Sequence, residues 1–345
     1  MEQTLRQRNR SLDVLRGLAC LCIILIHKPF PGSFASLTIP ITRGAVPFFF
    51  LVSGYFAYRK TKEEGVRMAK RRVRHMALLC LAVTALYLLY FFWLFDFQIG
   101  EALNSMRLDS AEVWLRFLFL NDLSGFFSII GPFWFLYALL YVYLLVWGAE
   151  KLGILKKMQI LWPILLCLVL FCAEIYPLVW GKEIKNYYYR NFLIEGMGFF
   201  LLGHWLKRRE DLLARCKDVW LILIACIGLI ASTAFQFLYF ENPSVQSFEW
   251  YFGSCAAWVA MSMLAMRHPA CPERLLSYIG EHYSLTVYAI HMLVISLTNR
   301  ITIDSYRFSL FRPILVMICC IAFAAVWSLC LTACKRWFAK KTKTE

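Results

Sequence analysis

The sequence predicts an all-α integral membrane protein, a polytopic helical bundle of about ten transmembrane helices with both termini in the cytoplasm. Hydrophobic residues make up 60% of the 345 residues, above the roughly 45 to 50% typical of soluble domains. Apolar runs near the ~20 residues needed to cross a bilayer recur along the whole chain. Lysine and arginine residues gather in short clusters between these runs. The mean hydropathy of +0.59 agrees with a membrane class.

Ten apolar segments have the composition of a span. They are residues 12–30, 40–58, 76–95, 126–148, 159–180, 190–206, 218–239, 248–266, 278–298 and 311–334. The first run is too long for a signal peptide and lacks a small-residue cleavage site, so we expect it to persist as a span. Segment 111–123 is apolar but too short to cross, so we expect it at the outer interface or re-entering the bilayer.

The positive charges predict the orientation of the chain. If the N-terminus is cytoplasmic, the segments on its side hold 27 of the 37 lysine and arginine residues, and the other side holds 10. The positive-inside rule then places both termini in the cytoplasm. We therefore expect one membrane domain over residues 1–345, with a cytoplasmic N-terminus (1–11), a bundle (12–334) and a basic cytoplasmic tail (335–345). Membrane topology accounts for the net charge of +15 without a nucleic-acid partner.

The cysteine pattern does not predict a metal site. Most of the 13 cysteines lie inside apolar runs, with no Cys-x-x-Cys pair and no interleaved histidine ligands. We interpret them as small apolar packing residues. The sequence also lacks a clear internal repeat, which an inverted-repeat transporter is expected to leave.

The first span carries two ionisable residues with an informative spacing. Arg16 lies near its cytoplasmic end and His27 in its outer half, with almost wholly apolar residues between them. The two share one helix face and lie about 16 Å apart along the axis. An arginine suits phosphates, and an imidazole can take a proton from a hydroxyl and return one to a thiol. The alternative is that His27 is a satisfied core histidine.

Four sequence blocks occur in an order typical of one family. They are 11–17 with His27, which together form an Arg-x10-His pattern, and then 46–56, 132–137 and 283–291. These blocks resemble the membrane acyltransferase-3 family, which includes acyl-CoA-dependent O-acetyltransferases of bacterial surface polysaccharides and peptidoglycan. The chain has Trp-Phe-Leu-Tyr-Ala where the peptidoglycan branch tends to have Trp-Ser-Leu-x-x-Glu, and it lacks a trailing esterase-like domain. It therefore looks like the stand-alone polysaccharide-modifying members.

The resemblance implies acetyl-CoA as the acyl donor and a division of roles among the site residues. Arg16, Arg72 and Arg74 would bind the coenzyme A end, with Ser53 lining the path of the acyl-CoA. His27 would be the general base, assisted by His291. On a regular helix Arg72 and Arg74 point about 200° apart, so a joint phosphate clamp needs an extended backbone or the Arg71/Arg74 pair. The basic segment could also be only a positive-inside anchor.

Three further residues are candidates for binding the acceptor. Trp134 and Tyr137 are expected in the outer part of the bundle, where aromatic faces could stack on a sugar ring. Interfacial or packing roles are the alternative for both. Glu195 lies one to two turns below the outer surface and could orient an imidazole or bind a hydroxyl. Its alternative is a structural ion pair with Arg190 or another outer arginine.

These observations predict an O-acetyltransferase of the bacterial inner membrane. It would transfer acetyl from cytosolic acetyl-CoA to a hydroxyl of an extracytoplasmic glycan or lipid-linked sugar, without a metal. One alternative is a transporter or flippase of a lipid-linked oligosaccharide, and another is the transfer of a different acyl group such as succinyl. The sequence does not distinguish direct transfer from an acyl-enzyme, and it does not predict the acceptor or the oligomeric state.

Overall fold

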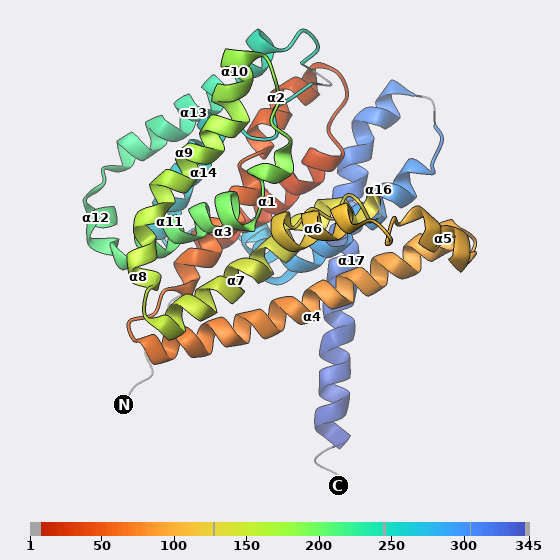
Figure 1. Cartoon of the computed structure of the whole chain (residues 1–345), viewed down its shortest axis with the longest axis horizontal. Coiled ribbons are helices and arrows are strands. Elements are labelled where there is room, and N and C mark those ends of the chain that lie inside the picture. Colours follow the sequence, from red (N-terminus) through yellow and green to blue (C-terminus); the bar gives the residue numbers. More distant parts are fainter. Residues whose placement is uncertain (1–7, 127, 244–245, 304, 342–345) are drawn as a thin grey trace.

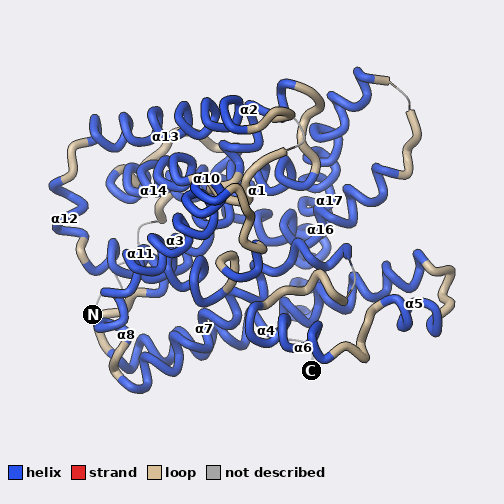
Figure 2. Tube along the Cα trace, turned by 45° about the horizontal axis from the view of Figure 1, so that its top comes forward, coloured by secondary structure: helices blue, strands red, loops and turns tan. Residues whose placement is uncertain are grey.

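The computed structural model describes residues 8–126, 128–243, 246–303 and 305–341, and these ranges contain helices and loops but no strand (Figure 2). The α-helices are α1 (Arg10–His27), α2 (Ser33–Thr42), α3 (Ala45–Ala57), α4 (Lys62–Leu94), α5 (Ile99–Ser105), α6 (Ala111–Leu120), α7 (Trp134–Leu152), α8 (Leu155–Met158), α9 (Trp162–Leu170), α10 (Tyr176–Trp180), α11 (Met197–Arg208), α12 (Glu210–Arg215), α13 (Asp218–Tyr239), α14 (Phe252–Arg267), α15 (Leu275–Tyr278), α16 (Ser284–Asn299) and α17 (Tyr306–Lys341). Short 3-10 or π-helical segments are η1 (Ser128–Phe133), η2 (Gln159–Leu161), η3 (Phe171–Ile175), η4 (Asn186–Tyr188), η5 (Phe192–Gly196) and η6 (Ile279–Tyr283). The predicted all-α class is confirmed.

All ten predicted spans overlap helices, and six helical segments in the described ranges are long and apolar enough to cross a membrane. These are Ser33–Ala57, Lys62–Leu94, Ile130–Leu152, Leu155–Trp180, Asp218–Tyr239 and Tyr306–Ala333. The other four predicted spans fall on α1, on η5 with α11, on α14, and on α15 to α16. The polytopic class is therefore confirmed, while the count of ten stays a prediction. Residues 1–7 and 342–345, which include the chain ends, lie outside the described residues.

Helix α1 occupies the middle of the bundle in Figure 1 and contacts α15, η6, α3, α2, α14, α16 and α17. The side chain of Asn9 caps its first turn by accepting a hydrogen bond from the amide of Leu12 (2.8 Å). The side-chain amide of Asn9 also donates a hydrogen bond to the Ala265 carbonyl (2.8 Å). The start of α1 is thus fixed to the end of α14.

Glycines allow α1 to approach its neighbours closely. A Cβ atom on Gly17 would overlap the carbonyl oxygen of Leu276 in α15. A Cβ atom on Gly280 in η6 would overlap the carbonyl oxygen of Asp13 in α1. Only glycine fits at these two points, so the pair fixes the depth at which α1 lies against η6.

Helices α3 and α11 pack with the same close backbone contact. A Cβ on Gly54 would overlap the Phe200 carbonyl, and one on Gly203 would overlap the Leu51 carbonyl. Gly54, the neighbour of Ser53, therefore has a packing role. One turn before Gly54, the Phe50 ring of α3 meets Phe135 of α7 edge-on, with centroids 4.7 Å apart. Helix α3 thereby joins α11 to α7.

Helices α4 and α17 lie at the edges of the bundle. Helix α4 packs along α7, and in Figure 1 it runs along the lower edge of the molecule. Helix α17 packs mainly on α16, and its lower half extends past the rest of the bundle in Figure 1. Helix α6, which covers most of segment 111–123, has 10 residues and is too short to cross a bilayer, as expected.

Candidate active site

A cavity of about 260 Å³ lies at the C-terminal end of α1. We call it the outer cavity, and it is lined by His27, Leu120, Asn121, Asp122, Ser124, Gly131, Pro132, Trp134, Asn186, Tyr187 and Arg190. A smaller cavity of about 20 Å³ adjoins it, sharing His27, Pro132, Trp134 and Arg190 and adding Ile23, Ile26, Arg43, Val46, Glu195, Glu249 and Tyr288. The structure therefore brings three of the candidate site residues, His27, Trp134 and Glu195, to one cavity.

His27 lies beside His291 of α16. Their ring centroids are 5.3 Å apart, and the side chain of His291 is fully buried. The Nδ1 atom of His291 lies 2.6 Å from the carbonyl oxygen of Tyr288. A carbonyl only accepts hydrogen bonds, so Nδ1 must carry a hydrogen, and Nε2 of a neutral ring is then an acceptor. This Nε2 has no hydrogen-bond partner in the described part of the chain. His291 is therefore arranged to receive a proton-bearing group beside His27.

Two arginines from loops, Arg43 and Arg190, line the small cavity and share one carboxylate. Glu249 pairs with Arg43 at 2.9 Å and also with Arg190. The guanidinium of Arg190 lies 4.7 Å from the ring centroid of Trp134, as in a cation–π contact. Arg190 is thus held between a carboxylate and an aromatic face, and Arg43 is held by the same carboxylate. Both arginines line the small cavity.

Glu195 is placed at this cavity by an irregular turn. It belongs to the π-helix η5, whose first turn is capped by the side chain of Asn191. The amide of Phe192 in the same turn donates to Oδ1 of Asn121 (2.7 Å). A π turn widens the helix and is frequent at functional sites. The Oε2 atom of Glu195 is buried without a hydrogen-bond partner among the described residues, and Arg190 pairs with Glu249 instead.

A third cavity, of about 190 Å³, lies toward the other end of α1. We call it the inner cavity, and it is lined by Arg16, Phe49, Ser53, Arg72, His75, Met76, Phe135, Leu136, Leu139, Tyr143, Ser284, Leu285 and Tyr288. Arg16 is held by Asp13 (3.0 Å) and lies 4.9 Å from the ring centroid of Phe56. Three of the four residues expected to bind the donor, Arg16, Arg72 and Ser53, therefore line one cavity.

The side chain of Tyr288 lies between the two ends of the site. It lines both the inner cavity and the small cavity that contains His27. Its hydroxyl donates to the Pro132 carbonyl (3.0 Å), at the end of η1 just before α7. Helix α1 thus presents Arg16 to the inner cavity and His27 to the outer cavity and the small cavity. Tyr288 lies between the inner cavity and the small cavity.

Arg74 and Tyr137 do not line these cavities. Helix α4 is continuous from Lys62 to Leu94, so Arg74 points away from Arg72 and is exposed. The hydroxyl of Tyr137 bonds with that of Thr84 in α4, and its ring meets Phe117 of α6 edge-on. The structure gives Tyr137 a packing environment, whereas its neighbour Trp134 faces the cavity.

Sequence reasoning missed several residues that line the cavities. They are Asn121, Asn186, Glu249, Tyr143 and Tyr288. Tyr288 lies within the block 283–291, so that block held a signal. The others lie in loops, in the short 3-10 helix η4 or in a plain apolar helix, where no local pattern marks them. Among the described residues, no three His, Cys, Asp or Glu side chains come together as a metal site requires.

Comparison with known proteins places this site in a family. An acyltransferase-domain family model matches residues 9–333. A serine/alanine racemase of Enterococcus gallinarum is 23% identical over 361 residues, an alignment that covers 98% of this chain. The chain spans only 48% of that relative's length. No solved structure matches. Because the family model covers nearly the whole chain, including the residues that line all three cavities, this protein belongs to acyltransferase family 3.

Proposed function

We propose that this acyltransferase takes an acetyl group from cytosolic acetyl-CoA and delivers it to a hydroxyl on an extracytoplasmic glycan or lipid-linked sugar. The observation that carries the proposal is the position of Arg16 and His27 at two cavities that meet at Tyr288. The anionic end of acetyl-CoA would lie at Arg16 and Arg72, and the thioester would extend toward His27. The acceptor would enter from the outer cavity, so donor and acceptor meet inside the bundle.

The chemistry needs one base and no metal. A nitrogen of His27 takes the proton of the acceptor hydroxyl while the oxygen attacks the thioester carbonyl carbon. The C–S bond breaks, and the departing thiolate of coenzyme A takes a proton from the imidazolium of His27. The acceptor nitrogen of His291 would hold the protonated ring of His27 in place. The products are the acetyl ester and coenzyme A.

The lining of the outer cavity supports a sugar acceptor. Asn121, Asp122 and Asn186 offer amide and carboxylate groups for hydroxyls, and Trp134 offers an aromatic face for a sugar ring. Glu195 could accept a hydrogen bond from a sugar hydroxyl or from His27. This chain matches only about half of the length of the racemase relative. The activity in that relative's name therefore does not argue against a sugar acceptor here.

The test uses purified protein and acetyl-CoA labelled in the acetyl group. We expect His27→Gln to lower transfer to a membrane glycan extract at least about 100-fold, because a general base contributes that much or more. Binding of acetyl-CoA should persist, since His27 does not line the inner cavity. The matched control is His268→Gln, whose side chain is bonded to Asp218 away from these cavities.

Full transfer by His27→Gln would overturn the proposal. A flippase of a lipid-linked oligosaccharide would leave acetyl-CoA unchanged in the wild-type assay, so release of coenzyme A separates the two functions. Succinyl-CoA in place of acetyl-CoA tests the nature of the acyl group. We place the protein in the bacterial inner membrane, and acetylation of surface glycans, compared by mass spectrometry with and without the protein, tests that location and the acceptor class.

A further inference from the structure

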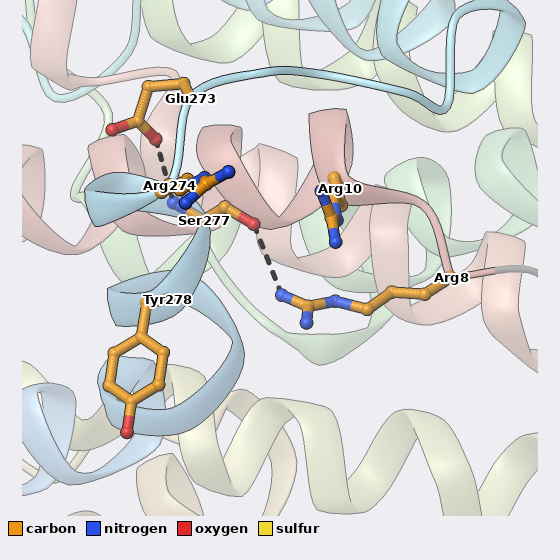
Figure 3. A pocket seen from close by; sticks show the side chains of 6 residues that line it. All are labelled: Arg8, Arg10, Glu273, Arg274, Ser277 and Tyr278. Atoms are coloured by element: carbon orange, nitrogen blue, oxygen red, sulfur yellow. Dashed lines mark hydrogen bonds between the residues drawn. The ribbon is translucent and has the colours of Figure 1, made fainter.

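A separate cavity of about 290 Å³ lies where the start of α1 meets α15 (Figure 3). It is lined by Arg8, Arg10, Glu273, Arg274, Ser277 and Tyr278. The amide of Arg10 donates to the Pro269 carbonyl (2.9 Å), so the chain before α15 is fixed to the first turn of α1. The cavity therefore has walls from two segments that are far apart in the sequence and joined by hydrogen bonds.

The charges in this cavity are unbalanced. The carboxylate of Glu273 accepts the amides of Leu275, Leu276 and Ser277, so it is used in capping α15. Arg8 pairs with Asp13 (2.8 Å) and Glu281 (2.5 Å). Among the described residues, Arg10 and Arg274 make no ion pair. Two guanidinium groups are therefore available to a ligand, and such groups bind a phosphate through forked, charge-assisted hydrogen bonds.

One carboxylate connects this cavity to the inner cavity. Asp13 binds Arg8 through Oδ2 (2.8 Å) and Arg16 through Oδ1 (3.0 Å). Arg8 lines the cavity at the start of α1, and Arg16 lines the inner cavity. Arg10 precedes Arg16 by about 9 Å along the helix axis, on the side away from His27. Along the axis of α1, cationic groups thus continue beyond the inner cavity, on the side away from His27.

The order of these groups along α1 is the order of the groups in acyl-CoA. The thioester is followed by the pantetheine arm, then by the diphosphate, and last by the ribose with its 3′-phosphate. We infer that Arg10 and Arg274 bind the 3′-phosphate of coenzyme A, with Arg16 and Arg72 at the diphosphate. The inference rests on the proposed function, because it extends the donor site by one group.

The experiment compares two donors that differ only in this phosphate. Transfer by the purified protein is measured with acetyl-CoA and with acetyl-3′-dephospho-CoA, and equilibrium binding of CoA and 3′-dephospho-CoA is measured in parallel. We expect the wild type to prefer the phosphorylated ligand at least about 10-fold in kcat/KM and in Kd, as hydrogen bonds between charged groups can provide. Arg10→Gln and Arg274→Gln should remove most of that preference and leave use of the dephosphorylated donor unchanged.

The matched control is Arg215→Gln in the short helix α12. Arg215 is an exposed arginine in another basic segment, and it lines none of the cavities described above. It should keep the wild-type preference. Thermal unfolding of each variant shows whether it is folded. A misfolded variant is replaced by the corresponding methionine substitution, which also removes the charge and should lose the preference in the same way.

Each outcome decides the inference. Equal use of both donors by the wild type, or a preference that survives in both variants, would overturn it while the acetyltransferase function stands. Failure of the wild type to bind or turn over either donor would overturn both. Assays in vesicles with and without anionic lipid form the last arm. If the variants change only the response to anionic lipid, the two arginines bind lipid headgroups, and the inference is wrong.

Discussion

Arg72 and Arg74 show how two neighbouring arginines can differ in role. Only Arg72 lines the inner cavity with Arg16, because the continuous helix α4 turns Arg74 to an exposed face. We expect Arg72→Ala to raise the KM for acetyl-CoA about 10-fold, as the loss of a charged hydrogen bond does. Arg74→Ala should stay within about twofold of the wild type, because an exposed guanidinium adds little.

Steady-state kinetics with purified protein checks both variants, and the pair serves as its own control. Equal increases in KM would mean that the segment acts only through its overall charge. A larger effect of Arg74→Ala would mean that α4 opens to an extended backbone when the donor binds. Either result would contradict the position of Arg72 in the inner cavity.

Residues on one helix were predictable, whereas residues joined by the fold were not. Arg16 and His27 share a face of α1, so helical periodicity alone predicts their relation. Arg190 and Glu249 are 59 positions apart, and both lie outside regular α-helix. No local pattern relates them. For Glu195 the sequence offered a pair with Arg190 as an alternative, but that arginine is bound to Glu249.

Among the helices, the packing of α1 against η6 depends on Gly280. A Cβ atom there would overlap the Asp13 carbonyl, and neither backbone can move alone. We expect Gly280→Ala to lower the free energy of unfolding by about 1–3 kcal/mol, as overpacking of a tight contact does. Because Asp13 also holds Arg16 (3.0 Å), a shift of α1 should raise the KM for acetyl-CoA as well.

The control for Gly280→Ala is Gly148→Ala in α7. Gly148 has the same chemistry but no atom within 4 Å of the position where its Cβ would be. Its substitution should leave thermal stability in detergent and the KM unchanged or slightly improved, since alanine favours helix over glycine. Equal stability of the two variants would mean that α1 can separate from η6 without cost.

The elements themselves were easier to predict than their irregularities. The predicted span 218–239 has the bounds of α13 (Asp218–Tyr239), because a largely apolar run without internal charges lies between Lys217-Asp218 and Glu241. The predicted span 190–206 contains the π-helix η5 before α11. Hydropathy responds to the apolar content of a window and not to the number of residues in a turn. The turn that orients Glu195 was therefore not visible in the sequence.

For the whole molecule, the sequence predicted which loops share a side, and the structure adds what each side contains. In Figure 1, α8 and α12 lie at one end of the bundle and α5 at the other. Lysine and arginine are concentrated in the segments that include α8 and α12. Charge counting could not show that α17 packs mainly on α16, or that α4 lies along α7, because those contacts depend on side-chain fit.

Cysteine labelling can test which side of the membrane the outer cavity and helix α8 face. Ser124 is exposed at the outer cavity, and Lys156 is exposed on α8. In a protein whose 13 native cysteines have been replaced and whose activity is retained, we expect Ser124→Cys to react with a membrane-impermeant maleimide added to intact cells. Lys156→Cys should react only after permeabilisation, because the positive-inside rule places α8 in the cytoplasm.

The reverse labelling pattern would affect the mechanism as well as the topology. Cytosolic acetyl-CoA would then reach the cavity that contains His27 without first passing Arg16 and Arg72, and the order of groups along α1 would oppose the entry of the donor. With the expected pattern, Arg16 on α1 would lie toward the cytosol, where the phosphates of the donor are proposed to bind, and the proposed base His27 would lie toward the acceptor. Loss of Ser124→Cys labelling in the presence of a glycan acceptor would further connect the outer cavity with the acceptor.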